Sequence, residues 1–375
     1  MLVLASPSAA AGAVPRGFVG VMGDGPLFSP AVDLDREVDV MTRAGVEALR
    51  VGFYWAHGQP LPAGTATPPG WANVGGVPTT FTETDRMVAA AARRRVQLLP
   101  VVLLAPGWAR AVPWQTWSPP SHAAYARYAR YVGALVARYK RGGSFWLERP
   151  RLRPMPIRAW QIWNEPNGPR FWTVQPGLAQ YAALLRTTRA AIRRADPRAR
   201  VVLAGLTDRS WASLAQLYRL GIRASADMIA LNPFSAEPRN VVRIVRRARA
   251  VMRRNGDALK PLLVTETSWP SAKDRVVAPF GYEETEAGQA SRLAQVLLAL
   301  ARERLRLRIR QVFWYTWMSL DRDPLYSFDW AGVRRLDGLR VTTKPAYYSL
   351  RRVARSLEGC GARPAPPRCH RSGPR

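Results

Sequence analysis

The chain contains few of the side chains that most metal and redox sites require. Among its 375 residues there are three histidines and two cysteines. The sequence has no H-E-x-x-H motif, no cysteine–histidine cluster with metal-ligand spacing and no P-loop. The G-D-G-P segment after the first apolar run lacks the G-x-G-x-x-G spacing of a dinucleotide-binding turn. Histidine-based catalysis is therefore poorly supplied, and we expect neither a metal ion nor a cofactor.

Long apolar runs are also absent. The sequence is 47% hydrophobic, which is enough for a large core, but no run reaches the length of a membrane span. We therefore expect no transmembrane segment. The length by itself would favour two domains, although single α/β barrels commonly reach this size.

Acidic residues are scarce relative to basic ones. There are 26 Asp and Glu against 56 Lys and Arg, which gives a formal charge of +30. Such a balance occurs in proteins that bind nucleic acids or other acidic polymers. The arginines recur at helical spacing and form no single tail, which is more typical of solvated helix faces. The clearest example comprises Arg243, Arg246, Arg247, Arg249, Arg253 and Arg254. We expect no specific nucleic-acid partner, and an anionic glycan stays an open alternative.

The two ends of the chain suggest an exported protein. Residues 1–15 are short, apolar and rich in small side chains, and they resemble the remnant of a signal peptide without its positive start. Residues 356–375 form a Pro- and Arg-rich tail that carries Cys360 and Cys369. These cysteines suit one small-loop disulfide, and the alternative is two free thiols on a disordered tail. We expect a secreted or cell-envelope protein, and its oligomeric state is not readable from the sequence.

Eight short apolar runs alternate with stretches rich in arginine and alanine. The runs are nearly continuous in Val, Ile, Leu and aromatic residues, which is typical of strands buried on both faces. They cover residues 17–23, 46–55, 96–105, 157–163, 200–206, 228–234, 262–265 and 310–317. Helical periodicity marks residues 33–44, 84–95, 121–140, 177–195, 211–220, 241–255 and 285–303.

The repeated alternation of strand and helix predicts a single (β/α)8 TIM barrel over residues 16–355. A doubly wound sheet is the alternative, but it would bring a Gly-rich phosphate turn after an early strand, and that turn is missing. For the second predicted helix we expect Thr84 or Asp85 as the N-cap.

Polar and aromatic side chains follow several predicted strands, at the end of the barrel where such enzymes place their catalytic groups. Glu165 follows the fourth strand and Glu266 ends the seventh, so we expect the two carboxylates across the barrel mouth from each other. Other polar and aromatic side chains near strand ends are Arg50, Tyr54, Trp108, Asn164, Trp172, Asn232 and Trp317.

Two carboxylates at one barrel mouth meet the requirement of glycoside hydrolysis. One must be protonated to donate to the leaving oxygen, and the other must be ionised to attack the anomeric carbon or to activate water. An isolated glutamate is more often a helix cap or a solvated loop residue. Two glutamates at the ends of buried strands, surrounded by aromatic residues, favour a site. Tryptophans stack on sugar rings, so Trp108, Trp114 and Trp117 after the third strand and Trp172 after the fourth suggest several subsites and an oligo- or polysaccharide.

Two motifs are more specific than these patterns. W-N-E-P-N at residues 163–167 resembles the acid/base signature of glycoside hydrolase clan A, and V-T-E-T-S-W at residues 264–269 resembles its nucleophile strand. The resemblance covers most of residues 17–355 and is nearest to family 39 and cellulase-like members. It also includes R-V-G-F-Y-W, V-Q-L-L-P-V-V and K-P-A-Y, at residues 50–55, 96–102 and 344–347.

The resemblance implies a role for each matching residue in a retaining double displacement. Glu165 would be the general acid/base and Glu266 the nucleophile. Asn164 would bind the sugar 2-hydroxyl, Arg50 would contact the nucleophile, and Trp317 would be the sugar platform. Trp108, Trp172 and Asn232 complete the predicted substrate-binding set.

The chain departs from the clan pattern after the sixth predicted strand. Many members carry a His-x-Tyr pair there, whose tyrosine bonds the nucleophile, but here Asn232 and Phe234 occupy these positions. That bond is therefore absent or supplied by another residue, such as Tyr282 or Tyr315. The departure keeps open an alternative, a catalytically weak or inactive carbohydrate-binding barrel.

Overall fold

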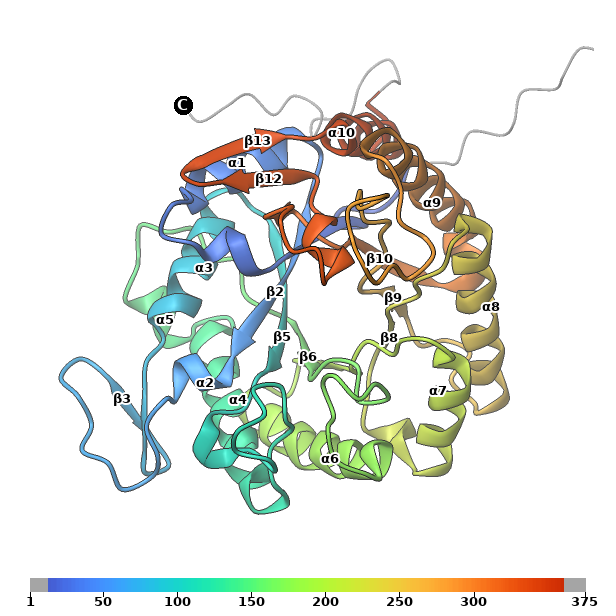
Figure 1. Ribbon diagram of the computed structural model, residues 1–375. Coiled ribbons are helices and arrows are strands. Elements are labelled where there is room, and N and C mark those ends of the chain that lie inside the picture. Colours follow the sequence, from blue (N-terminus) through green and yellow to red (C-terminus); the bar gives the residue numbers. More distant parts are fainter. Residues whose placement is uncertain (1–12, 361–375) are drawn as a thin grey trace, which may run out of the picture.

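Eight parallel strands form the centre of the fold, as Figure 1 shows for the computed structural model, which describes residues 13–360. The sheet order is β7-β6-β5-β2-β1-β10-β9-β8. The parallel bridges Val202–Met228 and Leu206–Leu231 connect its two edges. This arrangement confirms the predicted TIM barrel. The strands are β1 Val19–Gly23, β2 Ala48–Tyr54, β5 Gln97–Leu103, β6 Ala159–Ile162, β7 Arg200–Val202, β8 Ile229–Leu231, β9 Leu262–Val264 and β10 Ile309–Trp314.

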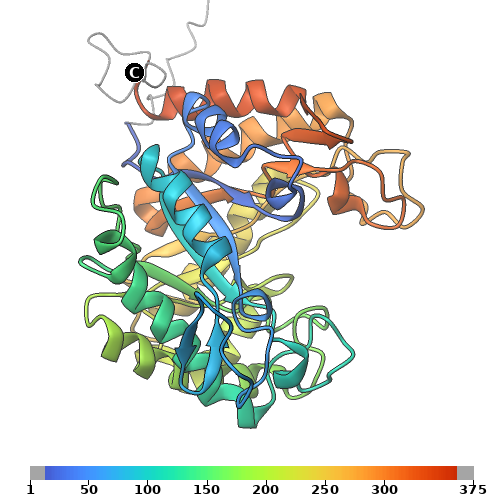
Figure 2. The ribbon, with the colours of Figure 1, turned by 90° about the vertical axis from the view of Figure 1, so that its left-hand side faces the viewer.

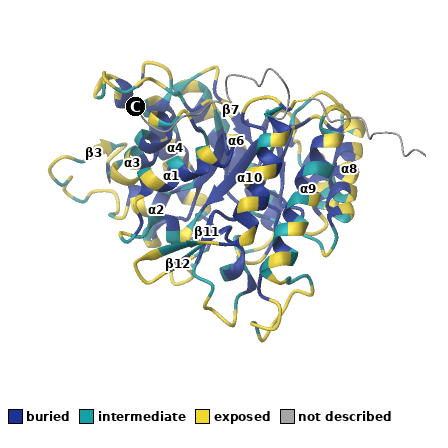
Figure 3. Cartoon of the chain, turned by 90° about the horizontal axis from the view of Figure 1, so that it is seen from above, coloured by how far each residue is buried: buried dark blue, intermediate teal, exposed yellow. Residues whose placement is uncertain are grey.

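An outer ring of helices surrounds the strands (Figure 1). The long helices are α1 Leu34–Arg43, α3 Thr82–Arg93, α4 Tyr125–Tyr139, α6 Gly177–Ala195, α7 Ser210–Arg219, α8 Pro238–Arg254, α9 Glu286–Leu307 and α10 Pro345–Leu357. Each buries one face on the barrel and leaves the other in solvent, as the burial colours of Figure 3 show. In the part of the chain that the structure describes, we find no helix long and apolar enough to span a membrane.

The two-residue period of a strand explains how polar side chains reach the barrel interior. In β2, Leu49, Val51 and Phe53 belong to the large core cluster that also contains the helix side chains. Arg50 and Tyr54 alternate with them and line a cavity inside the barrel. A separate small cluster of strand side chains fills the rest of the interior, and it consists of Ala48, Leu99, Val202, Met228, Ala230, Leu263 and Phe313.

Several element boundaries differ from the prediction. Helix α3 begins at Thr82, its N-cap is Phe81, and no side chain caps it, so the expected caps at Thr84 and Asp85 are wrong. Thr84 and Asp85 lie within the helix and bond the hydroxyl of Tyr139 instead. Most strands end before the predicted run does, because the chain leaves the sheet and its last apolar residues pack in the loops at the mouth.

Smaller elements that the periodicity did not indicate lie in the loops. They are α2 Trp55–Gly58, α5 Ser144–Leu147, the hairpin β3 Ala72–Val74 with β4 Val77–Thr79, the sheet of β11 Met318–Ser319, β12 Arg334–Asp337 and β13 Arg340–Thr343, and the 3-10 helices Gly25–Phe28, Gly107–Ala109, His122–Ala124, Ile222–Ala224 and Ser327–Trp330. The hairpin projects from the side of the barrel in Figure 1. Figure 2 shows the loops after β9 and β10 projecting beyond the mouth, on the right of the view.

The two ends of the described chain meet at the C-terminal end of α10. Val14 is buried, and its amide donates to the carbonyl of Leu357 at 2.9 Å. Helix α10 ends at Leu357, two residues past position 355, where the sequence predicted the end of the barrel. Residues 1–12 of the expected signal-peptide remnant and Cys369 of the expected disulfide lie outside the described residues.

Candidate active site

A cavity of about 400 Å³ lies at the mouth of the barrel and contains both predicted glutamates. Nine of its 22 lining residues are aromatic, which suits the apolar faces of sugar rings. The aromatic lining residues are Tyr54, Trp117, Phe171, Phe234, Phe280, Tyr282, Tyr315, Tyr326 and Phe328. They come from the end of β2 and from the segments after five other strands, so only the closed barrel brings them together.

Glu165 is the third residue after β6 and sits in an unusual backbone conformation. Trp163 and Glu165 both have positive φ, at 66° and 40°. Such strain in non-glycine residues persists where surrounding structure imposes it, and it is common at functional sites. Here the amide of Glu165 donates to the carbonyl of Gly205 at 3.0 Å, which ties the turn to the loop after β7. The turn directs the carboxyl group into the cavity.

Glu266 follows β9 by two residues and contacts a buried cation. Arg50, which is fully buried, donates from Nη1 to Oε1 of Glu266 at 2.5 Å. This is the contact that the clan resemblance implied. The same guanidinium donates from Nη2 to Oδ1 of Asn164 at 2.9 Å and from Nε to Oε1 of Gln161 at 2.7 Å. Arg50 therefore has a fixed orientation, because acceptors in or directly after two strands, β6 and β9, hold its planar donor groups.

Asn232 links Glu165 to Asn164 and to Thr265, the residue before Glu266. Its Nδ2 donates to Oε1 of Glu165 at 2.8 Å and to Oδ1 of Asn164 at 3.3 Å, and its Oδ1 accepts from Thr265 Oγ1 at 2.7 Å. A Cβ at position 205 would lie 2.3 Å from Asn232 Oδ1, so only glycine leaves room for this amide. The sequence placed Asn232 among the substrate contacts; in the structure its side chain is fully buried, lies outside the cavity lining and holds Glu165.

The two carboxyl groups have different electrostatic surroundings. Burial raises the pKa of Glu165 to about 8, and the charge of Glu266 adds to the rise. Burial also raises the pKa of Glu266, but the Arg50 guanidinium opposes that rise. Glu165 has a neutral amide as its hydrogen-bond partner, whereas Glu266 has a cation. When the pair shares one proton, these surroundings favour Glu165 as the group that carries it.

The predicted tryptophan contacts need correction. Trp172 and Trp317 are fully buried, so neither ring face is available to a sugar. Trp317 donates its indole N–H to Glu37 at 2.8 Å, and Trp172 donates to Gln180 at 3.1 Å. Trp108 donates to the carbonyl of Gln59 and lies outside the cavity lining. A sequence identifies an aromatic side chain near a strand end but not the direction in which the loop turns it.

Trp117 lines the cavity instead, beside Phe171, with ring centroids 5.2 Å apart. Phe234 also lines it, where many clan members have a tyrosine. Tyr282 and Tyr315 face the same cavity, but within the described chain no tyrosine hydroxyl lies in hydrogen-bond distance of Glu266. Within the described residues, Arg50 is thus the one side chain that forms a hydrogen bond and ion pair with Glu266.

Two acidic side chains that line the cavity, Asp24 and Asp208, were not among the residues predicted from the sequence. Asp24 follows β1 directly, within the G-D-G-P segment that was considered only as a phosphate turn. Its position at a strand end was the available signal. Asp208 follows β7 at a greater distance, and no sequence pattern marks it.

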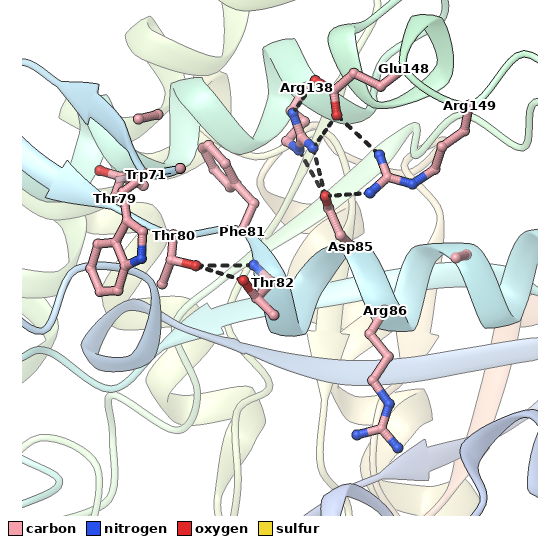
Figure 4. Close-up of a pocket in the computed structure, with 13 residues that line it drawn as sticks. Trp71, Thr79, Thr80, Phe81, Thr82, Asp85, Arg86, Arg138, Glu148 and Arg149 are labelled. Carbon is pink, nitrogen blue, oxygen red and sulfur yellow. Dashed lines mark hydrogen bonds and ion pairs between the residues drawn. The ribbon is translucent and has the colours of Figure 1, made fainter. Parts of the chain in front are cut away.

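A second, larger cavity of about 620 Å³ lies on the flank of the barrel, between the β3–β4 hairpin, α3 and the end of α4 (Figure 4). Arg138 and Arg149 both bind Asp85 and Glu148 there, at distances of 2.6–3.0 Å. The charged groups satisfy one another, which is typical of a structural ion-pair network. Glu165 and Glu266 line the mouth cavity instead, so we place the candidate active site at the mouth.

The arginine cluster at residues 243–254 lies on α8 and contributes nothing to the mouth cavity, whose arginines are Arg50 and Arg170. Within residues 13–360, no group of three or more His, Cys, Asp or Glu side chains is arranged to hold a metal ion.

Comparison with known proteins gives matches to solved structures. A scan against protein-family models finds no match. A search of curated proteins also finds none. A family 39 glycoside hydrolase from Bacteroides cellulosilyticus WH2 aligns with a TM-score of 0.64 at 17% identity, over 92% of this chain and 64% of that chain. A monomeric β-xylosidase from Caulobacter crescentus CB15 aligns with a TM-score of 0.64 at 19% identity, over 91% of this chain and 69% of that chain.

A family 51 α-L-arabinofuranosidase from Bifidobacterium longum aligns with a TM-score of 0.60 at 12% identity, over 92% of this chain and 76% of that chain. The chain thus spans about two thirds of the length of the first two structures. At these identities the comparison concerns the fold, and at that level it confirms the resemblance found in the sequence. The chain has the TIM-barrel fold of family 39 and family 51 glycoside hydrolases.

Proposed function

We propose that this protein is a retaining glycoside hydrolase that cleaves O-glycosidic bonds of an oligo- or polysaccharide. The observation that carries the proposal is the asymmetry of the two cavity glutamates. Glu165 keeps a proton because of burial, and Glu266 is paired with Arg50 at 2.5 Å. Two carboxyl groups with opposite protonation states in one aromatic cavity are what glycoside hydrolysis requires. The fold shared with glycosidases supports the proposal.

The proposed mechanism has two displacements. In the first, a carboxylate oxygen of Glu266 bonds the anomeric carbon while the glycosidic C–O bond breaks and Glu165 protonates the leaving oxygen. In the second, Glu165, now ionised, removes a proton from water, and the water oxygen displaces Glu266 from the anomeric carbon. In this mechanism Asn164, whose side-chain oxygen accepts from Arg50 and Asn232, binds a sugar hydroxyl during both steps.

Replacement of each glutamate tests these roles. We expect Glu165→Gln and Glu266→Gln to lose most hydrolysis of a glycan or aryl glycoside panel while remaining folded. Glu148→Gln is a matched control, because this glutamate belongs to the flank network and lies outside the mouth cavity. Product configuration, followed by NMR, should show retention at the anomeric carbon.

Small anions distinguish the two roles further. In Glu266→Gly an added azide can fill the space of the missing carboxylate and attack directly, which gives a glycosyl azide of inverted configuration. In Glu165→Gly azide can attack only the glycosyl-enzyme, so its product has retained configuration. Full activity of both glutamine variants would exclude this mechanism. Sugar binding without any hydrolysis would instead identify the carbohydrate-binding alternative.

A further inference from the structure

Asp24 forms a compact cluster with two tyrosines on one wall of the mouth cavity. Oδ1 of Asp24 accepts from the hydroxyl of Tyr54 at 3.0 Å, and Oδ2 accepts from the hydroxyl of Tyr315 at 3.2 Å. Oδ1 also accepts from the amide of Gly25 at 2.8 Å. All three side chains line the cavity, and they come from the ends of β1, β2 and β10, three adjacent strands.

The direction of these hydrogen bonds determines what the cluster can bind. Burial, assisted by the Asp24 carboxylate, raises the pKa of both tyrosines well above its usual value, so both remain protonated at neutral pH. Each hydroxyl has one proton, and both protons are donated to Asp24. The tyrosine oxygens and the remaining lone pair of Oδ2 are therefore acceptors without a free proton. Such a wall binds groups that donate hydrogen bonds, and sugar hydroxyls do so.

The cluster lies on the nucleophile side of the site. Tyr315 directly follows β10, the neighbour of β9 from which Glu266 extends, and its amide donates to the carbonyl of Thr267 at 3.1 Å. Asp208 instead follows β7, the neighbour of β6 that leads to Glu165. In the proposed mechanism Glu266 bonds the anomeric carbon of one sugar, which stays on the enzyme after the first step and is called the retained sugar here. Glu165 protonates the group that leaves. The Asp24 wall therefore faces the retained sugar, and Asp208 lies toward the leaving group.

We propose that Asp24, with Tyr54 and Tyr315, is the specificity determinant for the retained sugar, selecting a neutral sugar with free hydroxyls and rejecting a uronic acid. The proposal rests on the proposed function and extends it to a substrate class. A sugar carboxylate at this wall would meet acceptors and the negative charge of Asp24 without a donor. Arg170 lies at the exposed rim over the ring of Tyr326, 4.5 Å from its centroid, and is the group that would favour an anionic sugar instead.

The test compares neutral, deoxy and uronic substrates on two variants. A panel of 4-nitrophenyl glycosides first identifies a hydrolysed neutral sugar. Its monodeoxy analogues and the matching uronide are then assayed with wild type, Asp24→Asn and Asp208→Asn. For wild type we expect removal of the recognised hydroxyl to lower kcat/KM by about 10- to 100-fold, the effect of a hydrogen bond to a charged group.

In Asp24→Asn that penalty should shrink by about 10-fold, and discrimination against the uronide should fall, because the amide removes the charge and supplies donors. Asp208→Asn should leave both the deoxy penalty and the uronide discrimination at their wild-type values. A merely structural role for Asp24 would lower kcat/KM equally for every substrate, and that outcome would overturn the proposal. A wild-type preference for the uronide would also overturn it and would point to Arg170.

Failure of the proposed function is a separate outcome. If no glycoside is hydrolysed, saturation-transfer NMR can measure binding of neutral monosaccharides and uronic acids to wild type and Asp24→Asn. Neutral-sugar binding that Asp24→Asn weakens about 10-fold would support the role of Asp24 although hydrolysis had failed. Equal binding by the two proteins, or no neutral-sugar binding at all, would overturn it.

Discussion

The protonation of Glu165 should make the stability of the folded protein depend on pH. The folded-state pKa is raised from 4.5 to about 8. Between these two values the folded protein binds more protons at Glu165 than the unfolded chain does. The free energy of unfolding therefore falls as pH rises through this window, and it levels off above about pH 8. Below the lower value the group makes no difference.

The magnitude follows from the size of the shift. At about 1.4 kcal/mol per tenfold change in proton affinity, a rise from 4.5 to about 8 corresponds to at most about 5 kcal/mol. Glu165 is only partly shielded from water, and its titration is shared with Glu266, so we expect about half of this value. Glu165→Gln removes the titrating group but keeps an oxygen that can accept from Asn232.

Urea unfolding from pH 5 to pH 9 measures the effect. We expect wild type and Glu165→Gln to be similarly stable at pH 5, and the variant to be more stable by about 2–3 kcal/mol at pH 9. Glu148→Gln should follow the pH dependence of wild type. Parallel curves for wild type and Glu165→Gln would refute the reasoning, because they would show that burial leaves the proton affinity of Glu165 near that of an exposed carboxyl.

Other side chains give simpler predictions. Arg50→Lys should lower kcat by about 100-fold and shift the acid limb of the pH–rate profile to higher pH, because a point charge replaces the planar donor that holds Glu266 ionised. Lys344→Met should lower the free energy of unfolding by about 2 kcal/mol in urea, because it removes a partner from Asp321, whose side chain is 1% exposed; no change would show that the pair contributes nothing. Trp117→Ala should lower kcat/KM at least tenfold with little change in Tm, and an effect confined to Tm would remove Trp117 from the substrate wall.

Patterning and local motifs in the sequence were sufficient for the barrel and for the location of the two glutamates. Buried parallel strands have continuous apolar runs, and a carboxylate at the end of such a run has few reasons to be there other than chemistry. W-N-E-P-N therefore indicated Glu165, and the seventh run indicated Glu266. Both side chains lie in one cavity of the structure.

The wall of that cavity was decided by tertiary structure. Trp172 and Trp317 stand near strand ends as Trp117 does, yet the loops turn the first two into the core and leave the third at the mouth. Asp24 has significance only because closure of the sheet brings Tyr54 and Tyr315 to it from two other strands. A strand's own sequence determines which of its side chains face inward. Which inward side chains meet depends on contacts between residues far apart in the chain, and those exist only in the closed barrel.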